Sequence, residues 1–262
     1  DETLQEKHNH ALLTLPVVFH EAGFSTTVSG LPYENYLEYP IENMYKGYEY
    51  VKRAETRGAY SDLWYQQHGI QKVQFLAKDI KRNFIWFSIF KMVSPVFRRT
   101  VYHNKYWTSF DSYNDGLPRF VDNYSELDYL PQLTDATSTE NSFIMIDNET
   151  VHESILLDYP DYIPTGKEAT RFGPGKYAKH DHFTTMMAVF NTYEKFFDYL
   201  KSIGVYDNTR IIIVSDHGTT VQVPELKNES GSKLKKQNVV ATLLVKDFYA
   251  HGPKYADRKS VV

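Results

Sequence analysis

Apolar side chains recur with a helical period in two long stretches of the chain, residues 3–22 and 179–203. In each stretch large apolar residues return every three or four positions, which is the spacing of one helix face. The first stripe consists of Leu12, Leu15, Val18 and Phe19, and the second of Phe183, Met186, Met187, Phe190, Tyr193, Phe197 and Leu200. Gly23 and Gly204 follow as helix terminators. Both stretches therefore predict helices whose striped face packs into a core.

Four short runs predict strands: 24–30, 142–147, 210–216 and 238–247. The last three are apolar runs bounded by polar residues, a pattern typical of strands buried in a parallel sheet. We expect these three to share one sheet, with 210–216 parallel to 142–147. The long helix between them is the crossover that parallel neighbours require.

The segment 69–92 predicts a further helix, and 101–141 predicts loops with one short helix near 119–132. The most apolar stretch is FIWFSIFKMVSPVF (84–97). It is shorter than the roughly 20 residues that span a bilayer, and Lys91 and Pro95 interrupt it. We interpret it as a core helix.

Strands separated by long helices predict one α/β domain over 1–262, a three-layer sandwich around a mostly parallel sheet. Composition narrows the function classes. A net charge of -4 gives no broad basic field for nucleic acid, and the absence of Cys excludes disulfides, zinc–thiolate sites and a Cys nucleophile. Ligands of such sheets bind beyond the carboxyl ends of the strands, where 142–147 and 210–216 both lead into acidic and histidine residues.

The sharpest candidate is IIIVSDHG (211–218), in which a β-branched strand delivers Asp216 and His217 side by side. A carboxylate and an imidazole at a strand end can both reach a divalent ion. The alternative is that Asp216 caps the next turn and His217 is a solvated neighbour.

The run GVYDNTRIIIVSDHG (204–218), preceded by FFDYLKSI (196–203), resembles the signature region of the alkaline-phosphatase/sulfatase superfamily. The resemblance is strongest to its membrane-anchored bacterial branch, which holds sulfatase-like proteins, lipoteichoic acid synthases and phosphoethanolamine transferases. It implies an alkaline-phosphatase-like fold, an extracytoplasmic location and Asp216 and His217 as metal ligands.

The resemblance also implies a substrate-contacting histidine in the loop after the strand 142–147, and His152 is the matching position. Its ring would hydrogen-bond a phosphate or sulfate oxygen or protonate a leaving group, and Asp147, Glu149 or Glu153 would hold its tautomer. The alternative is a surface histidine without a role. His180 and His182 are further pocket candidates, although two positions apart in a regular helix they would point in different directions.

Two parts of the family pattern are missing. Family members attack sulfur or phosphorus with an activated Thr, Ser or modified Cys and use an acidic ligand from the first strand, and no Ser or Thr in 1–30 has such a context. We therefore expect the chain to be an inactive fragment, truncated at its N-terminus, that binds metal weakly. Residues 221–234 also lack the histidine that the transferases often carry.

The function expected from the resemblance is a metal-dependent hydrolase or transferase of sulfuric or phosphoric esters. Manganese, zinc, calcium and magnesium all suit an Asp–His pair with oxygen donors. The expected partners are a small ester, a glycan or a lipid headgroup, with membrane contact only through segments absent from this chain. A non-catalytic anion-binding remnant of the same fold is the alternative. A nucleotide-binding domain is disfavoured because the chain has no Gly-rich phosphate loop.

Overall fold

The computed structural model describes residues 2–29, 31, 45–54, 57–72, 77–102, 116–218 and 241–252. The helices are α1 (Leu4–Glu21), α2 (Ser61–Gln67), α3 (Ala77–Met92), α4 (Pro95–Tyr102), α5 (Leu117–Asp128), α6 (Leu130–Leu133) and α7 (Asp181–Ser202). The strands are β1 (Ser25–Ser29), β2 (Val51–Ala54), β3 (Ser142–Ile146), β4 (Ile211–Val214) and β5 (Leu243–Lys246). The chain forms two compact units, residues 1–195 and 196–262.

The first unit is built on a parallel sheet in the order β2-β1-β3. Thr26 of the central strand pairs with Val51 on one side and with Phe143 on the other. The predicted strands 24–30 and 142–147 are confirmed as β1 and β3. The chain is therefore a mixed α/β protein with parallel strands, as expected.

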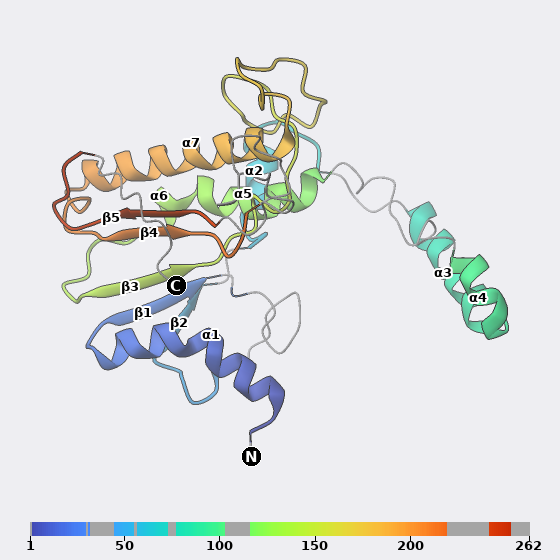
Figure 1. Cartoon of the computed structure of the whole chain (residues 1–262), viewed down its shortest axis with the longest axis horizontal. Coiled ribbons are helices and arrows are strands. Elements are labelled where there is room, and N and C mark those ends of the chain that lie inside the picture. The colour runs from blue at the N-terminus through green and yellow to red at the C-terminus, as the bar shows by residue number, and fades with distance from the viewer. Residues whose placement is uncertain are drawn as a thin grey trace, which may run out of the picture. The chain divides into compact units, whose positions relative to one another are not determined.

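Helices lie on both faces of this sheet (Figure 1). Val28 packs in one apolar cluster with Leu13 of α1, whereas its neighbour Ser29 hydrogen-bonds Glu126 of α5. Successive side chains of a strand point to opposite faces, so α1 covers one face and α5 the other. The contact of Val28 with α1 is therefore apolar, whereas the contact of Ser29 with α5 is polar.

Helix α1 confirms the prediction for 3–22, but its buried face is displaced from the expected stripe. Thr3 caps the helix, accepting from the Glu6 amide at 3.2 Å while Glu6 accepts in return from the Thr3 amide at 2.7 Å. The buried residues are Leu13 and Pro16, whereas Leu15 and Val18 of the predicted stripe are exposed.

A second apolar cluster in the first unit joins α2, α5 and the start of α7. Its fully buried members include Trp64, Phe120 and Val121. Helix α7 confirms the prediction for 179–203. Leu200 of the predicted stripe is buried, but Thr184 and Thr185, which lie outside the stripe, are more fully buried. Both threonine hydroxyls donate to the carbonyl of Ile155, so these polar side chains are satisfied where they are buried.

The helix predicted over 69–92 is confirmed as α3, which ends at Met92 as expected but begins later, at Ala77, and residues 69–72 are not helical. The backbone turns at Gly69, which has a positive φ of 64°. Interpreting 84–97 as core is wrong: its side chains from Phe84 to Phe87 are all exposed. No helix among the described residues is both long and apolar enough to cross a membrane.

In the second unit β4 pairs with β5 antiparallel, and Ile211 lies opposite Lys246. Within the described ranges this ribbon is a separate sheet from β2-β1-β3, so the expectation that 142–147, 210–216 and 238–247 share one sheet is wrong. Full burial of these strands is wrong too. Ile144 and Ile212 are 58% and 59% exposed, and exposure alternates along both strands, so one face of each strand is open among the described residues.

Candidate functional site

The loop that follows β3 carries His152 and is folded back by its own backbone. The Asp147 amide donates to the Ser29 carbonyl at 3.0 Å and so continues the ladder between β1 and β3. The chain then turns, and the amides of His152 and Glu153 both donate to the Glu149 carbonyl, at 3.0 and 3.1 Å. These bonds place His152 just beyond the carboxyl end of β3.

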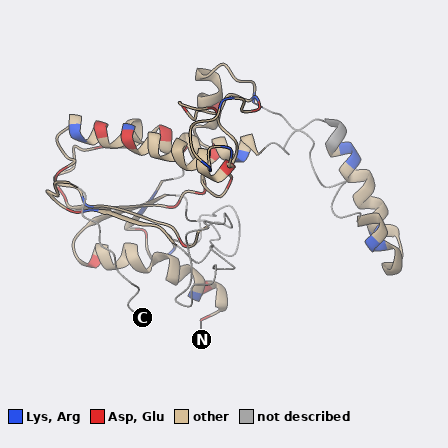
Figure 2. Ribbon diagram, turned by 45° about the horizontal axis from the view of Figure 1, so that its top comes forward, with Lys and Arg blue, Asp and Glu red and all other residues tan. Residues whose placement is uncertain are grey.

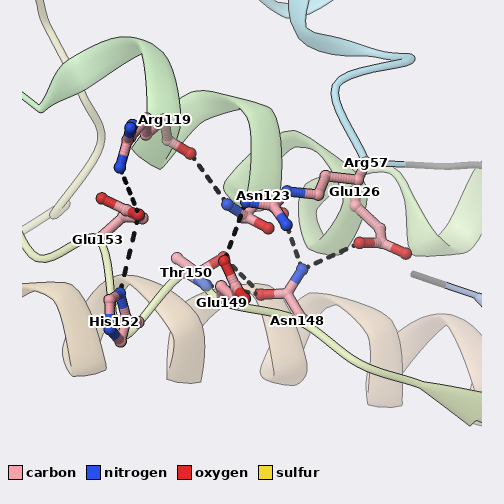
Figure 3. A network of polar contacts seen from close by, with 9 residues as sticks. All are labelled: Arg57, Arg119, Asn123, Glu126, Asn148, Glu149, Thr150, His152 and Glu153. Atoms are coloured by element: carbon pink, nitrogen blue, oxygen red, sulfur yellow. Dashed lines mark hydrogen bonds and ion pairs between the residues drawn. The ribbon is translucent and has the colours of Figure 1, made fainter. Parts of the chain in front are cut away.

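A buried polar network holds this loop against α5 (Figure 3). The Asn148 side-chain amide donates to the Asn123 carbonyl at 3.0 Å and to Glu126 Oε2 at 3.1 Å. Its Oδ1 accepts from both the amide and the hydroxyl of Thr150. Ser29 Oγ donates to the other carboxylate oxygen, Glu126 Oε1, at 2.7 Å. Every group in this chain of bonds has a partner, which fixes the start of the loop.

An ion pair fixes the loop from the other side. Arg57 Nη2 lies 2.9 Å from Glu149 Oε2, and the two side chains are 15% and 23% exposed. Sequence reasoning missed Arg57, which follows β2 and has no local motif that marks it. It also missed Glu126 and Asn148, because their link spans segments far apart in the chain.

His152 itself points away from this network, and its side chain is 73% exposed. Its Nδ1 lies 3.7 Å from Glu153 Oε1, which in turn lies 3.5 Å from Arg119 Nη1. A separation of 3.7 Å exceeds hydrogen-bond length, so Glu153 attracts a protonated ring without fixing its tautomer. The carboxylate of Glu149 is paired with Arg57 instead. A rigid loop thus presents an accessible imidazole.

His180 and His182 lie close to the same loop. His182 Nδ1 lies 3.3 Å from the Val151 carbonyl, which can only accept, so Nδ1 donates in this contact. The two imidazole rings stack with centroids 5.8 Å apart. The expectation that they point in different directions concerns a regular helix and does not apply, because α7 begins at Asp181 and His180 precedes it.

Asp181 lies between the two histidines and anchors them. His180 Nδ1 lies 3.0 Å from its Oδ1, an ion-pair distance without a hydrogen bond. Oδ1 accepts from the His182 amide at 2.7 Å, and Ser154 Oγ donates to Oδ2 at 3.1 Å. Burial raises the pKa of Asp181, but the bonds from His182 and Ser154 and the nearby histidine charges outweigh it, so the pKa is lowered. An ionised carboxylate therefore faces His180.

In the second unit the predicted metal ligands stand at the end of β4. The Ser215 amide donates to the Thr242 carbonyl at 3.0 Å, and the Thr242 amide donates to Ser215 Oγ at 2.8 Å. These bonds hold the strand end to the segment before β5. Asp216 and His217 follow and are largely exposed.

The two side chains face each other across a short gap. Asp216 Oδ2 lies 3.6 Å from His217 Nε2, while His217 Nδ1 lies 2.7 Å from the Gly218 carbonyl. A carbonyl only accepts, so Nδ1 donates, and in the neutral ring Nε2 carries a lone pair toward the carboxylate. Asp216 Oδ1 also accepts from the His217 amide at 2.8 Å, a local bond of the kind the capping alternative describes.

This geometry suits a divalent cation between the two lone pairs. With bonds of about 2.1 Å to nitrogen and oxygen, a separation of 3.6 Å subtends about 118° at the ion, near the tetrahedral angle. The pair supplies two ligands, and the described part of the chain contains no group of three or more His, Cys, Asp or Glu able to hold a metal. His152 belongs to the first unit and this pair to the second, so their convergence on one cleft stays a prediction.

No protein-family model, curated protein or solved structure matches the chain.

Proposed function

We propose that this chain contributes the metal-binding strand end and a substrate-contacting histidine to a hydrolase or transferase of sulfuric or phosphoric esters. The observation that carries the proposal is the facing pair of Asp216 Oδ2 and His217 Nε2, 3.6 Å apart at the end of β4. The parallel sheet with helices on both faces supports, at a coarser level, an alkaline-phosphatase-like domain.

Asp216 and His217 would hold the divalent ion, manganese, zinc, calcium or magnesium. Such an ion polarises a sulfuryl or phosphoryl oxygen and neutralises the charge that gathers there during displacement. The local bonds of the pair prepare it for this task. The His217 amide fixes Asp216 Oδ1, and the Gly218 carbonyl orients the ring so that Nε2 faces Oδ2.

His152 would contact the ester. Its ring is exposed and stands on a loop that Asn148 and the Arg57–Glu149 pair immobilise. An imidazole in that position can donate to a non-bridging oxygen or protonate a leaving group near neutral pH. His182 lies behind the loop and bonds Val151, which supports a positioning role. We place the ester on a small molecule, a glycan or a lipid headgroup outside the cell membrane.

The test is turnover of aryl phosphate and aryl sulfate esters by the full-length protein, with Mn²⁺ or Zn²⁺ added. Asp216→Asn should lower kcat/KM at least about a hundredfold, because the ion loses a charged ligand. The matched control is Asp198→Asn, which removes an exposed carboxylate of the same unit that pairs only with a surface lysine in the contacts seen here, and should leave turnover unchanged.

Unchanged turnover in Asp216→Asn would refute the proposal. Absence of turnover, together with metal-dependent binding of phosphate or sulfate that Asp216→Asn abolishes, would instead establish the non-catalytic anion-binding alternative. Binding is measured by calorimetry with and without the metal.

A further inference from the structure

Helices α3 and α4 expose a large apolar surface. Eight of their large apolar side chains are between 41% and 81% exposed: Ile80, Phe84, Ile85, Trp86, Phe87, Met92, Val96 and Phe97. Single exposed apolar residues are ordinary on soluble proteins, but eight on one pair of helices, with an exposed Trp and three exposed Phe, mark an interaction surface. The amino-acid pattern had suggested a buried helix for this segment, and the structure leaves it uncovered.

The two helices form a hairpin whose inner contacts use other residues. Phe90 of α3 and Tyr102 of α4 approach with ring centroids 6.3 Å apart, and Arg98 lies over the Phe90 ring at 5.8 Å. The Phe97 amide donates to the Ser94 carbonyl at 2.9 Å and closes the turn between the helices. The exposed apolar side chains keep between 41% and 81% of their surface accessible to a partner.

The charge of the hairpin is opposite to that of the chain. Its residues 77–102 contain six Lys and Arg and one acidic residue, Asp79, whereas the whole chain has a net charge of -4. The six are Lys78, Lys81, Arg82, Lys91, Arg98 and Arg99. Figure 2 shows the hairpin with blue bands and no red among its described residues. A partner that fits must therefore be both apolar and anionic.

We propose that the α3–α4 hairpin binds in the plane of a membrane whose surface carries anionic lipid. Aromatic and aliphatic side chains enter the boundary between headgroups and acyl chains, and Lys and Arg extend to the phosphates. At 16 residues α3 is about 24 Å long, short of the roughly 30 Å of a hydrocarbon core, so it lies on the membrane and does not cross it.

A second copy of this chain is a less suitable partner for the hairpin than an anionic membrane. Packing against the same surface of a second copy would bring the cations of both hairpins into a dry interface, where Asp79 is the one acidic residue of each hairpin. An anionic lipid surface offers both an apolar interior for the aromatic side chains and phosphates for the Lys and Arg side chains. The inference rests on the hairpin alone and does not depend on the ester chemistry.

The experiment is co-sedimentation of the full chain with phosphatidylcholine vesicles, with or without phosphatidylglycerol at about one lipid in four. We expect at least about tenfold tighter binding to the anionic vesicles. The triple reversal Lys91→Glu, Arg98→Glu and Arg99→Glu should weaken that binding more than about tenfold. The control reverses three exposed lysines elsewhere, Lys7→Glu, Lys46→Glu and Lys167→Glu, and should change it less than about threefold.

Trp86 provides a second readout that does not depend on charge. Its fluorescence should shift to the blue on anionic vesicles and be quenched by lipids brominated near the headgroup. Trp86→Phe should remove the shift while binding persists, since Phe keeps the apolar contact. Phe84→Ser with Phe97→Ser should weaken binding, with the fold of each variant checked by circular dichroism.

Failure of the unmodified chain to bind anionic vesicles would overturn the proposal. So would equal weakening by the hairpin reversal and by the control reversal. A concentration-dependent dimer that Phe84→Ser and Phe97→Ser dissociate, without vesicle binding, would assign the surface to a second copy. Full hydrogen-exchange protection of 77–102 in the free protein would assign it to the protein's own core.

Discussion

Arg57 and Glu149 form an ion pair, 2.9 Å between Nη2 and Oε2, across 92 positions of the chain, and both side chains are largely shielded from water. The pair joins the segment after β2 to the turn after β3. Because the Glu149 carbonyl accepts the amides of His152 and Glu153, the ion pair also sets where the His152 loop lies.

Replacing Arg57 by Ala should lower the free energy of unfolding by about 1–3 kcal/mol, because a partly buried carboxylate loses its charged partner. Urea denaturation measures the loss, and the NMR line width of the His152 ring should report a looser loop. Arg119→Ala is the control, since its 3.5 Å contact to Glu153 is more exposed and should contribute about 0.5 kcal/mol. Equal losses of unfolding free energy in the two variants would show that the Arg57–Glu149 pair stabilises the fold no more than the exposed Arg119–Glu153 contact.

Glu126→Gln should destabilise the first unit although the shape of the side chain is kept. The Glu126 carboxylate is 1% exposed and accepts from Ser29 Oγ and from Asn148 Nδ2 on its two oxygens. An amide would turn an NH2 group toward one of these donors, at a cost of about 1–3 kcal/mol. Thermal or urea unfolding tests this, with the exposed Glu140→Gln as control. A stability loss no larger than that of the control would contradict a stabilising role for the bonds of Glu126 with Ser29 and Asn148.

Elements with strong local patterns could be predicted from the sequence. The helices α1 and α7 and the strands β1, β3 and β4 were found because their period or β-branched run is continuous. Strand β2 was not, since Val-Lys-Arg-Ala (51–54) has neither alternation nor an apolar run. The buried faces of α1 and α7 differ from the predicted apolar stripes. In α7 this is because Thr184 and Thr185 are buried with their hydroxyls bonded to the Ile155 carbonyl, which a hydrophobicity pattern cannot predict.

Some residues of the candidate site could be proposed from the sequence, and others could not. Asp216, His217 and His152 could be proposed because each follows a predictable strand. The residues that hold the His152 loop in place could not be predicted, since the bonds from Arg57 to Glu149 and from Ser29 to Glu126 connect residues more than ninety positions apart. The metal-site pairing of Nε2 with Oδ2 depends on the His217 ring orientation, which only the Gly218 carbonyl contact reveals.

Asp181 should make stability depend on pH in the acid range. Its pKa is lowered in the folded chain, so it contributes stability that is present above its unfolded pKa of about 3.9 and is lost as pH falls through the folded value. The unfolding free energy of the unmodified chain should therefore fall more steeply below about pH 4 than that of Asp181→Asn. Urea titrations at several pH values give the two slopes. Parallel slopes would mean that His180, His182 and Ser154 do not stabilise the carboxylate.

The metal prediction follows from the Asp216–His217 gap. Two ligands form a small chelate, so this chain should bind Mn²⁺ or Zn²⁺ weakly, with Mn²⁺ broadening the His217 ring signals before those of other histidines. Asp216→Asn should weaken binding at least about fivefold, since a charged donor becomes neutral, whereas Asp198→Asn should not. Calorimetry gives the affinity. Broadening that persists unchanged in Asp216→Asn would place the ion elsewhere, and tight stoichiometric binding would require ligands beyond this pair.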